Sequence, residues 1–179
     1  MKLPLAYYGD PILRKKCAPV QHFDDELRQF VKDLEETVIA HEGAGMAAPQ
    51  VKRSLALFVT NVPQRKEDED HWRDCKMRLF INPKIIEYSE EEWLRGEGCL
   101  SIPGLYAPVS RPLRIKVRAY DIDGNEFTEE FSGLQARAIM HENDHINGVL
   151  FIDRVKGRER QDMENELKAI KKKYYDQTK

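Results

Sequence analysis

The sequence predicts an α+β fold in which antiparallel strands pack around a central metal-binding helix, with further helices toward the N- and C-terminal ends. Two histidines four residues apart, His141 and His145, fall on one face of a helix. Just before them, alternating apolar and polar residues over 115–120, an Asp-Gly turn and an apolar return over 127–131 predict a hairpin. Amphipathic stripes near both ends of the chain predict the outer helices.

The length of the chain indicates a single domain spanning residues 1–179, in which residues 156–179 are expected to form a C-terminal helix. Charged residues make up 34% of the chain, but the formal net charge is −2, which argues against general nucleic-acid binding. No apolar run is long enough to span a bilayer, and the first residues lack a signal-peptide core. Three cysteines, an odd number, suit a reducing compartment. We expect a cytoplasmic protein without membrane association.

The first helix is predicted to begin at Asp24, because acidic residues there suit the positive end of a helix dipole, and to end before Gly43. Its buried stripe consists of Leu27, Phe30, Val31, Leu34 and Val38. Short strands are expected at residues 54–60, 78–81 and 84–88, with an exposed charged loop over residues 62–77.

The helix with the two histidines is predicted over residues 134–146. Ser132 and Gln135 have the spacing of a capping box at its start, and Gly148 is expected to stop it. Residues 149–152 are predicted to form a short apolar strand. From Arg158 to Tyr175 the tail is predicted to be an amphipathic helix with a basic end, which complements the helix dipole and aids solubility.

The histidine pair predicts a metal site, and Glu142 beside it can reach a water held in the open part of the coordination shell. One metalloprotease class takes a histidine six residues after the second as its third ligand, but here that position is Phe151.

The spacing in the sequence leaves two candidates for the third ligand. Another protease class draws a glutamate from a later helix, and Glu164 and Glu166 lie near the required distance. Upstream, Cys99 in a glycine-containing segment could supply a thiolate that the metal keeps deprotonated.

Three separated motifs resemble the peptide deformylase family, in the same order. They are Gly-Ala-Gly-Met-Ala-Ala-Pro-Gln at residues 43–50, Glu-Gly-Cys-Leu-Ser at 97–101 and His-Glu-Asn-Asp-His at 141–145. The similarity extends to about Arg154 and weakens in the tail. Asn143 departs from the family, which often has a cysteine or an apolar residue there. The resemblance implies a hydrolase that removes the N-formyl group from the N-terminal formyl-methionine of newly synthesised polypeptides and releases formate.

The resemblance also implies roles for individual residues. Cys99, His141 and His145 are expected to hold one divalent metal ion. Fe(II) is implied as the working metal, while the ligand types also allow Zn(II), Ni(II) or Co(II). Glu142 is expected to handle the proton of the water, and the Gln50 amide and the Leu100 backbone N–H to stabilise the oxyanion.

Substrate contacts are expected at Ala44, Gly45, Glu97, Gly98, Arg111, Leu134 and Ala138. Of these, Ala44, Leu134 and Ala138 are candidates for an apolar pocket for the methionine side chain. The roles of the Gly45 backbone and of Arg111 are implied by the resemblance. It also implies that the basic tail docks to ribosomal RNA near the nascent-chain exit.

Two rival hypotheses come from other classes of protein. A zinc endopeptidase would use Glu164 or Glu166 as third ligand and tolerate loss of Cys99. A catalytically silent ribosome-associated module would keep the fold but not need Glu142.

Overall fold

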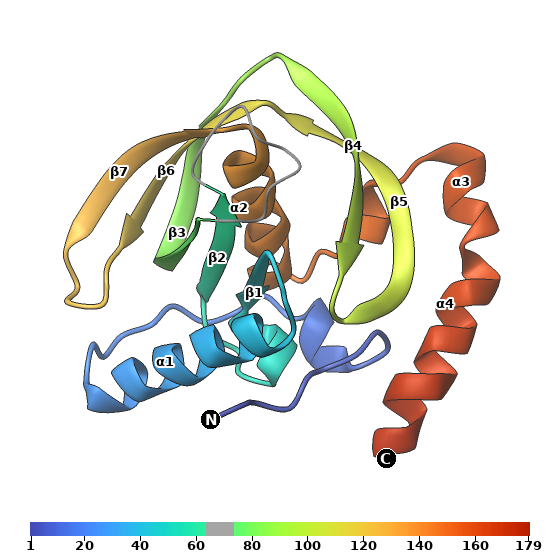
Figure 1. The fold of residues 1–179 in the computed structure, drawn as a ribbon, viewed down its shortest axis with the longest axis horizontal. Coiled ribbons are helices and arrows are strands. Elements are labelled where there is room, and N and C mark those ends of the chain that lie inside the picture. Colours follow the sequence, from blue (N-terminus) through green and yellow to red (C-terminus); the bar gives the residue numbers. More distant parts are fainter. Residues whose placement is uncertain (64–73) are drawn as a thin grey trace.

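The computed structural model of the chain describes residues 1–63 and 74–179, and it confirms the predicted α+β fold (Figure 1). The strands are β1 (Gly45–Ala47), β2 (Leu57–Pro63), β3 (Cys75–Tyr88), β4 (Glu92–Cys99), β5 (Ile102–Pro112), β6 (Arg114–Tyr120) and β7 (Glu126–Ser132). The helices are α1 (Asp25–Ala40), α2 (Gly133–Ile146), α3 (Gly157–Asp162) and α4 (Glu164–Ile170). Within the described ranges, no helix has the length and apolar character needed to cross a membrane.

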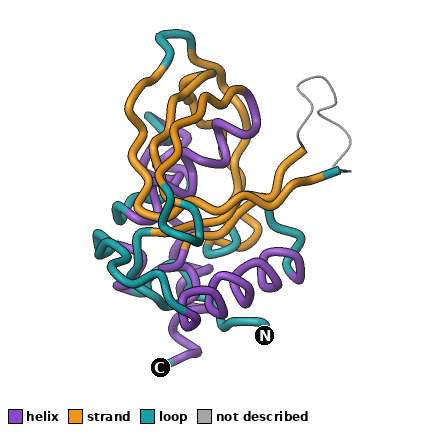
Figure 2. Tube along the Cα trace, turned by 90° about the vertical axis from the view of Figure 1, so that its left-hand side faces the viewer, coloured by secondary structure: helices purple, strands orange, loops and turns teal. Residues whose placement is uncertain are grey.

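Two sheets surround the central helix α2. One is five-stranded and antiparallel with strand order β1-β2-β3-β6-β7, and the other consists of β4 and β5 alone. Figure 1 shows α2 between the five-stranded sheet and the β4–β5 hairpin. Figure 2, turned by 90°, shows that both ends of the chain lie at the same end of the molecule.

Helix α1 forms as predicted. The Asp24 side chain caps it by accepting a hydrogen bond from the Leu27 backbone N–H at 2.9 Å. All the residues of the predicted stripe are buried. They pack in one cluster with the strand residues Leu57 and Val59, which fixes α1 against the five-stranded sheet.

The strands before the second motif differ in detail from the prediction. The hairpin of β6 and β7 is confirmed, but β2 starts at Leu57, and the two short strands expected around Pro83 are one continuous strand, β3. Asn82 has a positive φ of 48°, and the pairing with β6 is irregular between Ile81 and Lys84. Such a bulge accommodates a proline that would otherwise interrupt the ladder. Most of the predicted charged loop, residues 64–73, lies outside the described residues.

Helix α2 is confirmed, but its predicted capping box is wrong. The Ser132 side chain makes no capping hydrogen bond, and the Gln135 amide nitrogen lies 3.4 Å from the Pro63 carbonyl oxygen instead. Gln135 therefore ties α2 to the end of β2 and does not reach back to the start of its own helix. At the other end the helix stops at Ile146, and Gly148 adopts the left-handed conformation expected of a stop.

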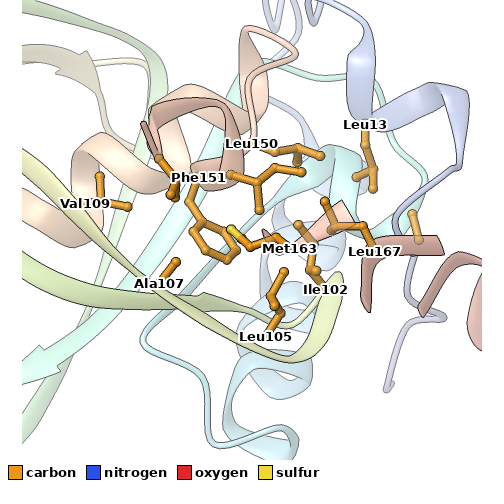
Figure 3. Close-up of a cluster of buried hydrophobic side chains, with 12 residues drawn as sticks. Leu13, Ile102, Leu105, Ala107, Val109, Leu150, Phe151, Met163 and Leu167 are labelled. Carbon is orange, nitrogen blue, oxygen red and sulfur yellow. The ribbon is translucent and has the colours of Figure 1, made fainter. Parts of the chain in front are cut away.

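The strand predicted over residues 149–152 is also wrong. A 3₁₀ turn, Phe151–Arg154, occupies this position, and the Asp153 carboxylate accepts a hydrogen bond from the Leu150 backbone N–H at 2.9 Å. Leu150, Phe151 and Ile152 are buried in one cluster with residues of β5 and of the tail (Figure 3). Burial on all sides, and not pairing in a sheet, explains the apolar run.

The predicted tail helix is divided into α3, α4 and a wider helical turn, Lys171–Tyr175. The predicted apolar stripe of the tail is confirmed where the tail packs on β5, since Met163 and Leu167 are buried beside Ile102 and Leu105 (Figure 3). The tail is therefore packed on the edge of the β4–β5 hairpin.

Candidate metal centre

The two histidines and Cys99 converge although Cys99 and His145 are 46 residues apart in the chain. The histidines project from one face of α2, and their ring centres are 5.2 Å apart. Cys99 is the last residue of β4, at the turn into β5, and its Sγ lies 3.3 Å from the His145 Nε2. One ligand atom from each of the three residues lies within 4.8 Å of the others. Two imidazoles and a thiol at this spacing fit one divalent transition-metal ion.

The carboxylates of the protease hypothesis are elsewhere. Glu164 and Glu166 are exposed on α4, and Glu164 binds Arg160 at 3.1 Å. Neither belongs to the possible metal-binding group found in the described part of the chain. The structure therefore favours Cys99 as the third ligand over a glutamate from the tail.

Glu97 orients the first histidine. Its Oε1 lies 2.9 Å from the His141 Nδ1, so Nδ1–H donates to the carboxylate and Nε2 is left to bind a metal. Burial alone would lower the pKa of His141, but contacts with Cys99 and Glu97 raise that pKa well above its ordinary value. The pKa of His145, in contrast, is lowered by burial and by the neighbouring charge of His141.

Two arginines hold Glu97 in place. Arg111 donates to both carboxylate oxygens, at 2.6 and 2.9 Å, and Arg137 donates to Oε2 as well. Arg137 also binds the backbone carbonyl oxygens of Val109 and Trp93, at 3.0 and 2.8 Å. Burial would raise the pKa of Glu97, but hydrogen bonds from His141 and Arg111 outweigh it and lower the pKa. Glu97 is therefore a buried anion matched by cations.

Arg111 connects this pair to Asp144 on α2. Its guanidinium donates to the Asp144 carboxylate at 3.0 Å, and Arg154 binds the same carboxylate through two hydrogen bonds of 2.8 and 2.7 Å. Only 3% of Arg111 is exposed, and it does not line the cavity described below. The expected position of Arg111 beside the substrate is therefore corrected: its charge is taken up by two carboxylates, and it braces β5 against α2.

Glu142 is buried on the same helix, beside strand β1. A Cβ added at Gly45 would lie 2.9 Å from the Glu142 Oε1, so a glycine at that position lets the carboxyl pack against the strand. The second oxygen, Oε2, is buried and has no hydrogen-bond partner within residues 1–63 and 74–179. Burial raises the pKa of this carboxyl to about 7. A carboxyl group whose pKa lies near neutral pH can both accept and return a proton.

Gln50 brings a neutral amide to the thiol. Its Oε1 accepts a hydrogen bond from the Ala47 backbone N–H at 2.9 Å, which fixes the orientation of the amide. The Nε2 then lies 3.5 Å from the Cys99 Sγ and 3.2 Å from the Ser101 Oγ. The first and second motifs are thereby joined at the site.

A cavity of about 1090 Å³ contains these groups. Its walls include Gln50, Cys99, Leu100, His141 and Glu142. Of the expected substrate contacts, Ala44, Gly45, Glu97, Gly98, Leu134 and Ala138 line it. Every predicted site residue lines this cavity except Arg111 and His145, and the His145 Nε2 lies 3.3 Å from the Cys99 Sγ.

Two groups of site residues were not predicted from sequence. Arg137 and Asp144 are seven residues apart, so both face the side of α2 that also carries His141, and this shared helix face was the available signal. Tyr7 and Tyr174 also line the cavity, but they come from opposite ends of the chain and no local pattern connects them.

A helix-borne histidine pair with a thiol beside it, next to a buried carboxyl at the wall of a cavity, is the arrangement of a single-metal hydrolase. A family model described as polypeptide deformylase matches residues 2–161. The peptide deformylase of Chlorobaculum parvum is 39% identical over 171 residues, covering 96% of this chain and 89% of that protein. Peptide deformylase 1 of Clostridium perfringens is 44% identical over 149 residues, covering 83% and 95%. The crystal structure of a plant peptide deformylase, PDF1B, aligns with a TM-score of 0.89 at 39% identity, covering 98% of this chain and 92% of that one.

The chain belongs to the peptide deformylase family, metal-dependent enzymes that remove the N-formyl group from nascent polypeptides. The activity inferred from the three motifs is thereby confirmed.

Proposed function

We propose that this chain carries out deformylation with Cys99, His141 and His145 as metal ligands and Glu142 as the acid–base group. The observation that carries the assignment is the shared cavity, into which the thiol, the first histidine and the buried carboxyl all face. The protease hypothesis requires Glu164 or Glu166 at the metal, and both are exposed on α4 and outside this group of ligands. A silent module would not need a buried carboxyl beside the ligands.

The ligand set fits one divalent ion, and Fe(II) is the ion we propose for the working enzyme. A bound ion supplies Lewis acidity, which lowers the pKa of a water and polarises the formyl carbonyl. The family resemblance supports Fe(II), while Zn(II), Ni(II) or Co(II) could replace it in a purified sample because the same ligands suit them. Cys99 lines the cavity, so its sulfur is accessible to oxidants.

The protein side of the reaction follows from the positions of three groups. Glu142 takes a proton from the attacking water, and the water oxygen bonds to the formyl carbon. The Gln50 amide and the Leu100 backbone N–H donate to the oxygen that becomes negative. When the C–N bond breaks, Glu142 returns the proton to the amine, giving formate and a free N-terminal amine.

The substrate pocket is assigned from the cavity walls. Ala44, Leu134 and Ala138 are small or apolar and are placed to receive the methionine side chain. The backbones of Gly45 and Gly98 can approach the substrate closely because neither carries a side chain. We assign Glu97 to positioning His141, because its carboxylate is already bound by two arginines.

Anaerobically prepared protein is expected to release formate from formyl-Met-Ala-Ser, and exposure to air is expected to stop the release as iron or Cys99 is oxidised. Formate and metal content are measured on the same sample before and after exposure. A fully metal-loaded protein that releases no formate would discard the proposed function. Activity that persists in air with zinc bound would reject Fe(II) as the working metal but would leave the proposed function standing.

We further propose that the chain acts as one cytoplasmic catalytic domain and that its basic tail docks to the ribosome. Helix α2 contacts both sheets, which supports a single unit. The small and odd number of cysteines in the sequence suits a reducing compartment. Four lysines over residues 168–173 of the tail are exposed, namely Lys168, Lys171, Lys172 and Lys173. An exposed basic surface suits the phosphates of RNA.

Reversing three of these charges, with Lys168→Glu, Lys172→Glu and Lys173→Glu combined, is expected to abolish co-sedimentation with ribosomes at low salt. Lys171 is kept because it packs against Gly9. A matched variant reverses three exposed lysines elsewhere, namely Lys15, Lys16 and Lys32. Formate release from free peptides should be unchanged in both variants. Equal co-sedimentation of the tail variant and the unmodified protein would reject docking through the tail.

A further inference from the structure

The segment before the first 3₁₀ turn is bonded to both motifs of the site. The Ala6 backbone N–H donates to the Gln50 carbonyl oxygen at 2.7 Å, and the Tyr8 backbone N–H donates to the Ser101 carbonyl oxygen at 2.8 Å. Tyr7 lies between these two anchors and lines the cavity. Its position is therefore fixed relative to the groups that act on the formyl bond.

The tail brings a second aromatic ring to the same place. The rings of Tyr7 and Tyr174 are stacked, with centres 5.0 Å apart and planes inclined by 30°. Tyr174 also lines the cavity, and both tyrosines are only half-buried, so each keeps accessible surface. The Lys173 Nζ also lies over the Tyr174 ring, 5.2 Å from its centre.

Two further contacts hold the tail in this position. Met163 and Leu167 are buried in the cluster with β5 (Figure 3), which anchors the start of the tail. Nearer its end, a Cβ added at Gly9 would lie 2.8 Å from side-chain atoms of both Lys171 and Tyr175. The tail and the N-terminal segment are thus in close contact, and Tyr174 is held against Tyr7 from both sides.

We propose that Tyr7 and Tyr174 form a binding wall for the peptide residues that follow the formyl-methionine, with a preference for apolar and aromatic side chains. The cavity lies at the upper end of the size range of small-ligand sites, about 300–1000 Å³, so it has room beyond formyl-methionine itself. A nascent peptide must continue out of the cavity, and a rigid stacked pair offers it a flat apolar surface. The inference rests on the proposed site and extends its substrate specificity into the C-terminal tail.

The test compares a substrate too short to reach the wall with one that is long enough. Formyl-Met amide is the short substrate, and formyl-Met-Ala-Phe-Leu is the long one. Tyr174→Ala is expected to raise KM for the long substrate by about 2–10-fold, the size of one aromatic contact, with kcat unchanged. KM for the short substrate should not change, and Tyr174→Phe should behave as the unmodified protein because it keeps the ring.

Tyr88→Ala is the matched control, since Tyr88 is an exposed tyrosine of β3 that does not line the cavity. Tyr7→Leu removes the other ring of the pair and should raise KM for the long substrate as Tyr174→Ala does. Because Tyr7 is not part of the tail, this variant tests the wall even if Tyr174→Ala loosens the tail. Equal changes of KM for both substrates, or the same length-dependent rise of KM in Tyr88→Ala, would overturn the proposed wall. If the unmodified protein releases formate from neither substrate, the proposed function itself is overturned.

Discussion

Replacing Glu142 by glutamine should lower kcat for formate release by about 10²–10⁴-fold, the usual contribution of a general acid–base group. Glutamine keeps the volume of the side chain and can still contact Gly45, but it cannot accept the proton of the attacking water. Because Glu142 is not in the predicted ligand set, metal content should stay at the level of the unmodified protein. Both quantities are measured on the same preparation.

Glu166→Gln is the matched control for this experiment. It makes the same chemical change on an exposed residue of the tail, and the protease hypothesis would assign that residue to the metal. We expect its activity and metal content to match the unmodified protein. Retained activity in Glu142→Gln would remove the residue from the mechanism, and loss of metal in Glu166→Gln would revive the protease hypothesis.

Cys99→Ala should remove the sulfur ligand and with it most of the bound metal. Loss of an outer partner of a ligand typically weakens metal binding by about 10–100-fold, and removing a direct ligand should cost more. Formate release should fall in proportion to metal content, measured as metal ions per chain after gel filtration. Cys99→Ser keeps an oxygen at the position and is expected either to lose the metal too or to exchange it for a harder ion.

Cys17→Ala controls for the loss of a thiol in general. Cys17 is a free, buried cysteine that packs in the core beneath the five-stranded sheet and does not line the cavity. Its substitution should leave metal content and activity unchanged. Full metal content and activity in Cys99→Ala would show that the thiol is not a ligand.

The elements with a strong local pattern could be predicted from sequence. Helix α1 carries an acidic cap and a regular stripe, and the hairpin of β6 and β7 has an Asp-Gly turn between alternating runs. In both cases the local signal and the tertiary environment agree. The histidine pair of α2 belongs with them, because a spacing of four residues fixes a shared helix face.

The failures have one physical cause, which is that contacts between distant segments decided the outcome. Four apolar residues at 149–152 satisfy a strand and a buried turn equally well, and only their packing against β5 and the tail distinguishes the two. Ser132 and Gln135 had the right spacing for a cap, but Pro63 offered Gln135 a partner outside the helix.

Arg111 is the clearest case in the candidate site. Its role depends on Glu97 fourteen residues before it and Asp144 thirty-three residues after it, and no spacing rule connects the three. The same holds for Tyr7 and Tyr174, which meet only because both ends of the chain fold over the second motif.

The position of Cys99 has a consequence for the folding of the chain. The cysteine belongs to the two-stranded sheet, whereas both histidines lie on the helix that packs against the five-stranded sheet. On the proposed ligand set, a bound ion acts as a cross-link between the two layers, comparable to a disulfide that closes a loop of 46 residues. The histidine pair is local and can capture an ion early, but the thiolate joins only when the hairpin docks. Binding of the ion by the thiolate as well then reports the completion of folding and readiness for catalysis.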